Sequence, residues 1–124
     1  MAPQRRRRLS RSGEFDRVYR EGSSNATRYL VLYSFPRRGE GDSEEVRLGV
    51  SASRKLGGAV DRNRAKRVLR EAFWGLADKL PEQHDFVLVA RPELGELIER
   101  EGASGVTQSI EEALAGSVPG GRST

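Results

Sequence analysis

Residues 61–74, DRNRAKRVLREAFW, combine five basic side chains with apolar side chains at helical spacing, and the rest of the chain is best understood from this stretch. Wound at 3.6 residues per turn and continued by GLADKL, it predicts a helix from about Val60 to Leu80. One side of this helix is a continuous apolar stripe, as expected where a helix packs on a core. The stripe comprises Ala65, Val68, Leu69, Ala72, Leu76 and Leu80, with Phe73 at its edge.

The other sides of this predicted helix are cationic or amide over its first turns. Cations near a helix N-terminus oppose the helix dipole, so they do not stabilise the helix itself. A face that is merely solvated would mix glutamates among them, yet no acid occurs between Asp61 and Glu71. Side chains that only donate hydrogen bonds suit phosphate oxygens and base edges, with a solvated face as the alternative. The residues are Arg62, Asn63, Arg64, Lys66, Arg67 and Arg70, preceded by Arg54 and Lys55.

The remaining segments alternate between helix and strand patterns. Residues 12–21 predict a short helix that Ser12 caps and Gly22 ends. Strand patterns cover residues 28–35, 46–53 and 85–91, and the last, apolar throughout its middle, is predicted to be the central strand. The first two are expected to pair as a hairpin, with Tyr29 and Tyr33 on one face of the first. A final helix is predicted over 104–114, and residues 94–100 are expected to form a turn or two.

Length and composition limit the class of protein. The 124 residues fit one compact domain, predicted over residues 10–116. Residues 1–9 are predicted to form a basic tail that is disordered when free, and residues 117–124 a C-terminal tail. The sequence has no cysteine, which excludes disulfides and thiol nucleophiles. Since no apolar run fits a membrane span or a secretory signal, a cytoplasmic protein with no membrane partner is expected.

The net charge of +4 conceals a separation of charge along the chain. Residues 1–38 and residues 46–70 each carry a net +7, whereas residues 39–45 carry −4 and residues 71–124 carry −6. A dipolar molecule of this kind favours a polyanion such as RNA as the partner of its basic side. A surface with charge asymmetry and no partner is the alternative. Arginine outnumbers lysine 19 to 3, which suits bidentate contacts with phosphate.

At this point the basic stretch resembles a known signature. The run RNRAKR at residues 62–67, preceded by SRKLGGAV, resembles the RNR signature of the protein subunit of bacterial ribonuclease P. The surrounding order is similar too, with EFDRVYREG, TRYLVLY, RLGVSASRKLGGAV and a strand ending in VLVARP. The likeness runs from about Arg8 to Pro92, and the last helix fits in pattern only. RNR alone would be a weak signal, but its combination with the flanking passages is specific.

The resemblance implies both a fold and an activity. The fold is an α+β sandwich in the order α-β-β-β-α-β-α, with a small mixed sheet, like the second domain of ribosomal protein S5. It carries a left-handed strand-helix-strand crossover, opposite to the usual hand. The activity is that of an RNA-binding subunit, one per catalytic RNA, in an endoribonuclease that removes the 5′ leader of precursor tRNA.

The resemblance also implies how the work is divided in that endoribonuclease. The RNA holds the catalytic Mg²⁺, and the protein holds no cofactor and supplies no catalytic residue. This sequence agrees, because His84 stands alone and no acidic pair has a recognisable ligand spacing. A ribosomal or general RNA-binding protein is the alternative reading, and a protein nuclease in its own right is disfavoured because no catalytic constellation is visible.

Two sets of site residues follow from the resemblance. The catalytic RNA is expected to contact Arg54, Lys55, Arg62, Asn63, Arg64, Lys66, Arg67 and Arg70. The single-stranded 5′ leader is expected in a cleft between the first helix and the sheet, lined by Phe15, Tyr19, Arg28, Tyr33, Ser51 and Arg91, with Ser53 nearby. Unpaired bases stack on aromatic rings without being read for sequence, although ordinary core packing is the alternative for the three aromatics. Trp74 departs from the family pattern and lies on the helix face away from the core stripe, where it is expected to cover the sheet edge or another element, with base stacking as the less favoured alternative.

Overall fold

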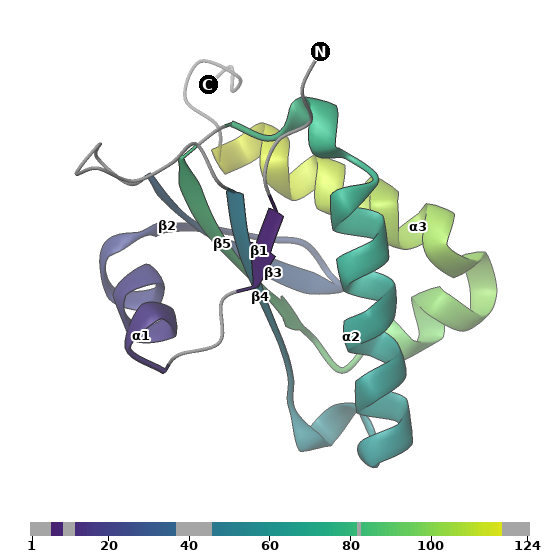
Figure 1. The fold of residues 1–124 in the computed structure, drawn as a ribbon. Helices are drawn as coiled ribbons and strands as arrows, with labels where there is room; N and C mark the ends of the chain where they lie inside the picture. Colours follow the sequence, from purple (N-terminus) through teal and green to yellow (C-terminus); the bar gives the residue numbers. More distant parts are fainter. Residues whose placement is uncertain (1–5, 9–11, 37–45, 82, 118–124) are drawn as a thin grey trace.

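The computed structural model describes residues 6–8, 12–36, 46–81 and 83–117, and places helices on both faces of one sheet (Figure 1). The strands are β1 (Arg6–Arg8), β2 (Ser23–Ala26), β3 (Leu30–Pro36), β4 (Val46–Ala52) and β5 (His84–Ala90). The helices are α1 (Ser12–Glu21), α2 (Ala59–Trp74) and α3 (Leu94–Ser117), with short 3₁₀ turns η1 (Arg54–Leu56) and η2 (Ala77–Lys79). From α1 onward the order of helices and strands is the α-β-β-β-α-β-α order expected from the resemblance.

The sheet is mixed, and β5 lies at its centre. The strand order is β1-β4-β5-β3-β2, with β5 parallel to β4 and antiparallel to β3. The central position predicted for residues 85–91 is confirmed, and the predicted hairpin between residues 28–35 and 46–53 is wrong. β5 separates those two strands because Phe86, Val87 and Leu88 are all fully buried, so both of its faces need cover. The connection β4-α2-β5 is the expected crossover, and its left-handed sense stays a prediction.

The helices cover the two faces of the sheet, and the hydrophobic cores on these faces differ in size. Figure 1 shows α2 and α3 on one side of the sheet and α1 on the other. The main core lies under α2 and α3, where Leu32, Leu48 and Leu88 of the sheet meet Leu69 and Ile110 of the helices. The second core is small and centres on Val18 of α1 against Val87 of β5. α1 is therefore held by few apolar contacts.

Two helices differ in extent from their predictions. α2 ends at Trp74 rather than continuing to Leu80, because Gly75 interrupts it and η2 follows. α3 starts at Leu94 rather than near 104, because residues 94–100 bury Leu94 and Leu97 and so gain enough packing to stay helical. Gly102, with a φ of 66°, breaks α3 internally, so its two halves pack at different angles.

The N-terminal segment also departs from the prediction. Arg6–Arg8, inside the tail predicted to be disordered, form β1 and pair in parallel with β4, with Arg6 opposite Val46. Pairing of this kind uses backbone hydrogen bonds, so it leaves no apolar alternation in the sequence. Residues 118–124 of the predicted C-terminal tail lie outside the described residues. Of the helices that the structure describes, none has the length and apolar character needed to cross a membrane.

Two aromatic residues lie in other surroundings than the strand and helix patterns predict. Tyr29, expected to share a face with Tyr33, packs instead on the main core, and its hydroxyl accepts a hydrogen bond from Arg100 of α3 at 3.0 Å. It lies just before β3, where strand alternation does not yet apply. Trp74 is half-buried and meets Phe73 edge-on at 5.1 Å, so it partly covers the core.

Candidate nucleic-acid interface

The basic face of α2 is mounted on a buried stripe. Ala65, Leu69, Ala72 and Phe73 are buried, as the helical spacing predicts, although Phe73 lies fully inside rather than at the edge. Phe73 also packs edge-on against Phe86 of β5, with ring centroids 5.3 Å apart. These contacts fix the helix on the sheet, so the opposite side of α2 is held in one orientation.

The polar residues of α2 project from that rigid support. Asn63, Arg64 and Arg67 are exposed, whereas Arg62, Lys66 and Arg70 are half-buried. Within the described ranges no salt bridge involves any of these cations. The Nε atom of Arg62 is enclosed and has no hydrogen-bond partner. The face therefore offers unneutralised positive charge to an anionic partner.

The turn between β4 and α2 adds two more cations to the same region. Arg54 and Lys55 lie in η1 and are exposed. The hydroxyl of Ser53 caps this turn by accepting a hydrogen bond from the Lys55 backbone N–H at 3.2 Å. Gly57, at φ 149°, closes the turn, and a side chain there would collide with Asp61. The eight residues predicted to contact the catalytic RNA thus all come from η1 and the following helix.

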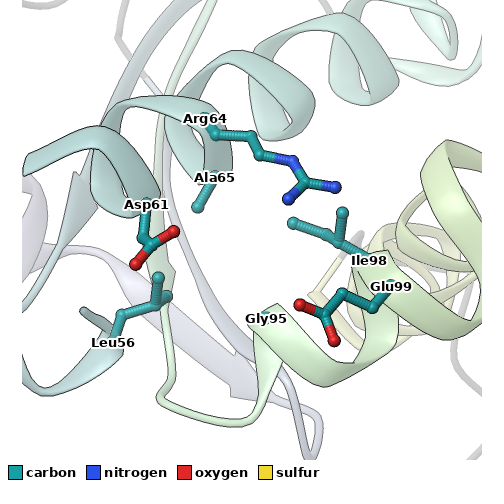
Figure 2. A pocket seen from close by; sticks show the side chains of 7 residues that line it. All are labelled: Leu56, Asp61, Arg64, Ala65, Gly95, Ile98 and Glu99. Carbon is teal, nitrogen blue, oxygen red and sulfur yellow. The ribbon is translucent and has the colours of Figure 1, made fainter. Parts of the chain in front are cut away.

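Arg64 differs from the other cations in its direction. Figure 2 shows its guanidinium extending across a pocket between α2 and α3, toward Ile98 and Glu99. This pocket has a volume of about 140 Å³, and Asp61 faces it from the first turn of α2. Arg64 is therefore presented between two carboxylate side chains, on the flank of the helix that faces α3.

A second candidate surface lies on the other face of the sheet, where α1 packs. The rings of Phe15 and Tyr19 are 6.2 Å apart, and those of Tyr19 and Tyr33 are 4.8 Å apart, both edge-on. Phe15 sits directly over Gly49 of β4, where a Cβ atom would come within 2.4 Å of the ring. Tyr19 is 39% exposed, so this cluster is neither fully core nor fully surface. The three aromatics predicted to line a leader cleft are brought together.

Burial and charge act on the phenol of Tyr19. Burial raises its pKa above the ordinary value of 10.0, and nearby Tyr33 and Asp16 raise it further. A tyrosine hydroxyl is neutral at physiological pH in any case, and these effects keep that of Tyr19 neutral, and able to donate a hydrogen bond, to a higher pH. A neutral ring suits contact with a polyanion, since an ionised phenol would repel it.

The remaining predicted leader residues lie toward one end of this face. Ser51 is half-buried and pairs in register with Val89 of β5, on the same sheet face as Gly49. Arg91 follows β5 and donates from Nη1 to the carbonyl oxygen of Thr27 at 3.3 Å. Arg28 is exposed and lies over the ring of Tyr29 at 5.9 Å, so it leans away from the aromatic cluster. The structure thus gathers four of the six residues on one face and places the two arginines at the end of the sheet.

One ionic cluster on the α1 face was not anticipated from the sequence. Asp85 is fully buried and accepts hydrogen bonds from Arg47 and Arg17. A signal for it existed in the opposite charges of Arg47 and Asp85, which stand at or near the starts of two predicted strands. Their pairing depends on the β4-β5 register, however, and the expected hairpin obscured that register.

The described residues bring no group of three or more histidine, cysteine or acidic side chains into an arrangement that could hold a metal ion. His84 is half-buried at the start of β5, and its ring stacks on Phe86 at 5.5 Å. It therefore packs as an ordinary part of the start of the central strand.

Comparisons with known proteins agree with this geometry. A model of the ribonuclease P protein family matches residues 4–114. The ribonuclease P protein component of Bacillus pumilus is 39% identical over 93 residues, covering 75% of this chain and 76% of that protein.

Solved structures give the same result. The Staphylococcus aureus ribonuclease P protein superposes with a TM-score of 0.72 at 31% identity, covering 86% of this chain and 91% of that one. The Thermotoga maritima ribonuclease P protein gives a TM-score of 0.73 at 30% identity, with 85% and 92% covered. With this sequence likeness and this fold, the chain belongs to the ribonuclease P protein family, the protein components of a ribonuclease that functions in tRNA processing.

Proposed function

We propose that this chain is the RNA-binding subunit of a ribonuclease P ribonucleoprotein in the cytoplasm, one copy per catalytic RNA. The basic face of α2 docks on the catalytic RNA, and the aromatic cleft beside α1 holds the 5′ leader of precursor tRNA. The observation that carries the proposal is the set of unneutralised cations on α2 and η1, fixed in place by the buried stripe beneath them.

Phosphate binding accounts for the composition of the α2 face better than solvation does. Half-buried arginines that make no ion pair within the described ranges keep their charge available and lose little freedom on binding. Guanidinium and amide groups can contact phosphates and base edges together. We assign Arg54, Lys55, Arg62, Asn63, Arg64, Lys66, Arg67 and Arg70 to this contact.

The cleft beside α1 supports a single-stranded ligand. Tyr19 and Tyr33 present partly accessible rings close to each other, and each stacked base is worth about 1–3 kcal/mol. Ser51 adds a hydroxyl on the same sheet face, while Arg28 and Arg91 supply charge at its end. Contacts of this type hold an unpaired strand without reading its sequence.

In this proposal the RNA partner carries out the hydrolysis. The residues assigned to the two surfaces carry cationic, amide, hydroxyl and aromatic groups, and none carries a carboxylate, the usual protein ligand of Mg²⁺. Magnesium would therefore be held by the catalytic RNA, where it would supply charge stabilisation and an activated water. The role of the protein is to orient the RNA and the leader.

Reconstitution tests the proposal directly. Precursor tRNA is incubated at low magnesium with the catalytic RNA alone, with the protein alone, and with both. Efficient removal of the 5′ leader is expected only from the combination. Cleavage by the protein alone would make the chain a nuclease itself. Equal cleavage with and without the protein, together with co-sedimentation on ribosomes, would favour a general RNA-binding protein.

A further inference from the structure

Among the described residues, two arginines donate hydrogen bonds to the buried acid Asp85. Arg47 donates from Nε to Oδ1 at 2.6 Å and from Nη2 to Oδ2 at 2.8 Å, so it binds both carboxylate oxygens. Arg17 donates to Oδ2 alone, at 3.1 Å. Arg47 and Asp85 form a closed bidentate pair, and Arg17 is an additional cation attached to it.

Arg17 is also the member of this cluster that solvent can reach. Its side chain is 40% exposed, compared with 11% for Arg47 and none for Asp85. Arg17 and Arg47 both donate to the carboxylate of Asp85, and of these two arginines Arg17 is the one with a substantially exposed side chain. A cation that is kept at the surface stays available to an anion.

The guanidinium of Arg17 is held in position before any ligand arrives. Asp85 binds one of its nitrogens, and its plane lies over the ring of Phe35 with 4.9 Å from Cζ to the ring centroid. Its Nε is enclosed and has no hydrogen-bond partner, so a phosphate would meet the accessible part of the side chain instead. An arginine fixed on two sides loses little conformational entropy when it binds phosphate.

The residues that hold Arg17 lie on the same face of the sheet as Tyr33 and Ser51. On β5 and its neighbours, Ser51 pairs with Val89, Tyr33 with Val87, and both Phe35 and Arg47 pair with Asp85. These pairs share the α1 face, because they are separated by even numbers of residues. The distance along β4 from Ser51 to Arg47 is roughly 13 Å at the usual rise of a strand. Arg17 therefore marks the end of the cleft opposite Ser51.

The chain direction decides which end of the cleft is near the site of cleavage. The C-terminal end of β4, beside Ser51, continues through Ser53 into η1 and the start of α2. This is where the proposed function places the catalytic RNA. A leader strand leaving that region meets Ser51 first, then Tyr33, and reaches Arg17 last.

We propose that Arg17 binds a backbone phosphate of the 5′ leader at the end of the cleft remote from the cleavage site. The inference rests on the proposed function, and it extends the cleft beyond the aromatic cluster by one charged contact. Phe35 and Asp85 act as positioning residues for the Arg17 guanidinium.

The test is a leader-length series. Holoenzyme is reconstituted with the parent protein, Arg17→Ala, Arg17→Lys and Tyr33→Ala, and its affinity is measured for precursors whose leaders grow one nucleotide at a time. Arg17→Ala should bind short-leader precursors like the parent and lose on the order of tenfold in affinity once the leader reaches the end of the cleft, as expected for one charge-assisted hydrogen bond. Arg17→Lys should keep part of that affinity, and Tyr33→Ala should lose affinity at shorter leaders.

The matched control is Arg20→Ala, which removes the same charge from an exposed position in the last turn of α1. Holoenzyme that contains this variant should bind precursors of every leader length with the affinity of the parent. An Arg17→Ala loss that is equal at all leader lengths would assign Arg17 to holding α1 and would overturn the proposal, as would no loss at any length. If Tyr33→Ala also shows no dependence on leader length, the leader cleft itself fails. Melting temperatures of all variants identify any loss that comes from unfolding.

Discussion

The two candidate surfaces are built in opposite ways. On α2 the cations project from a helix that is already anchored, and those exposed charges make no ion pair among the described residues. Beside α1 the candidate groups hold one another, through the contact of Tyr19 with Tyr33 and the bond from Arg17 to Asp85. The α2 surface can therefore change without affecting the fold, whereas the contacts of Tyr19 and Arg17 are part of what attaches α1 to the sheet.

The strongest test of this difference is to remove the acid at the base of the cleft. Asp85→Ala leaves the guanidinium of Arg47, only 11% exposed, without its bidentate partner. Breaking a buried pair from one side costs about 3–5 kcal/mol, which we expect as the loss in the free energy of unfolding by urea denaturation. The exposed Asp78 is the control, because Asp78→Ala should change stability by no more than about 0.5 kcal/mol. Equal stabilities for the two variants would refute a structural role for the cluster.

A smaller perturbation should move the ring of Phe15 without removing a charge. In Gly49→Ala the new methyl group would lie 2.4 Å from the ring of Phe15, so the ring has to move. Overpacking of this kind costs about 1–3 kcal/mol of stability, and we expect affinity for precursor tRNA to fall relative to mature tRNA. Gly95→Ala is the control, because nothing lies within 4 Å of a side chain at that helical position. Unchanged discrimination between precursor and mature tRNA would show that Phe15 does not shape the leader site.

On α2 we expect substitutions to lower the affinity for RNA while leaving the stability of the fold almost unchanged. Arg67→Ala removes an exposed cation, so the free energy of unfolding should change by no more than about 0.5 kcal/mol. Affinity for the catalytic RNA should nevertheless fall, and the salt dependence of binding should decrease by about one unit of slope for the lost phosphate contact. Arg64→Ala should behave in the same way. A fall in affinity with an unchanged slope would argue against a phosphate contact at that position.

The same contrast explains what could be predicted from the sequence. The stripe of Ala65, Leu69 and Ala72 follows from local periodicity, and so does the basic face opposite to it. The position of β5 at the centre follows from its apolar residues. These features depend on neighbours within a few positions along the chain.

Features that depend on distant pairing were missed. The register of Arg47 with Asp85, and the strand Arg6–Arg8 beside β4, arise from backbone pairing between segments far apart in sequence. The grouping of Phe15, Tyr19 and Tyr33 in a leader cleft was expected only through the family resemblance, since their pattern alone is more typical of ordinary core. The proposed cleft could therefore be recognised only from the fold, whereas the basic face of α2 could be predicted from the sequence.

The smallest expected effect concerns the ionisation of Tyr19. Burial, then Tyr33 and Asp16, raise its pKa in the folded protein above 10.0, so the unfolded chain loses this proton first as pH rises. The resulting stability is fully present below pH 10.0 and is lost as pH rises through the higher folded pKa. Tyr19→Phe should therefore reduce the alkaline loss of stability, and the difference in tyrosinate absorbance between the two proteins should give the titration of Tyr19 alone. Leader phosphates bound beside the ring would raise this pKa further, because they disfavour the phenolate. A titration that does not change when leader RNA is added would place the leader away from Tyr19, and would leave the aromatic cluster as core alone.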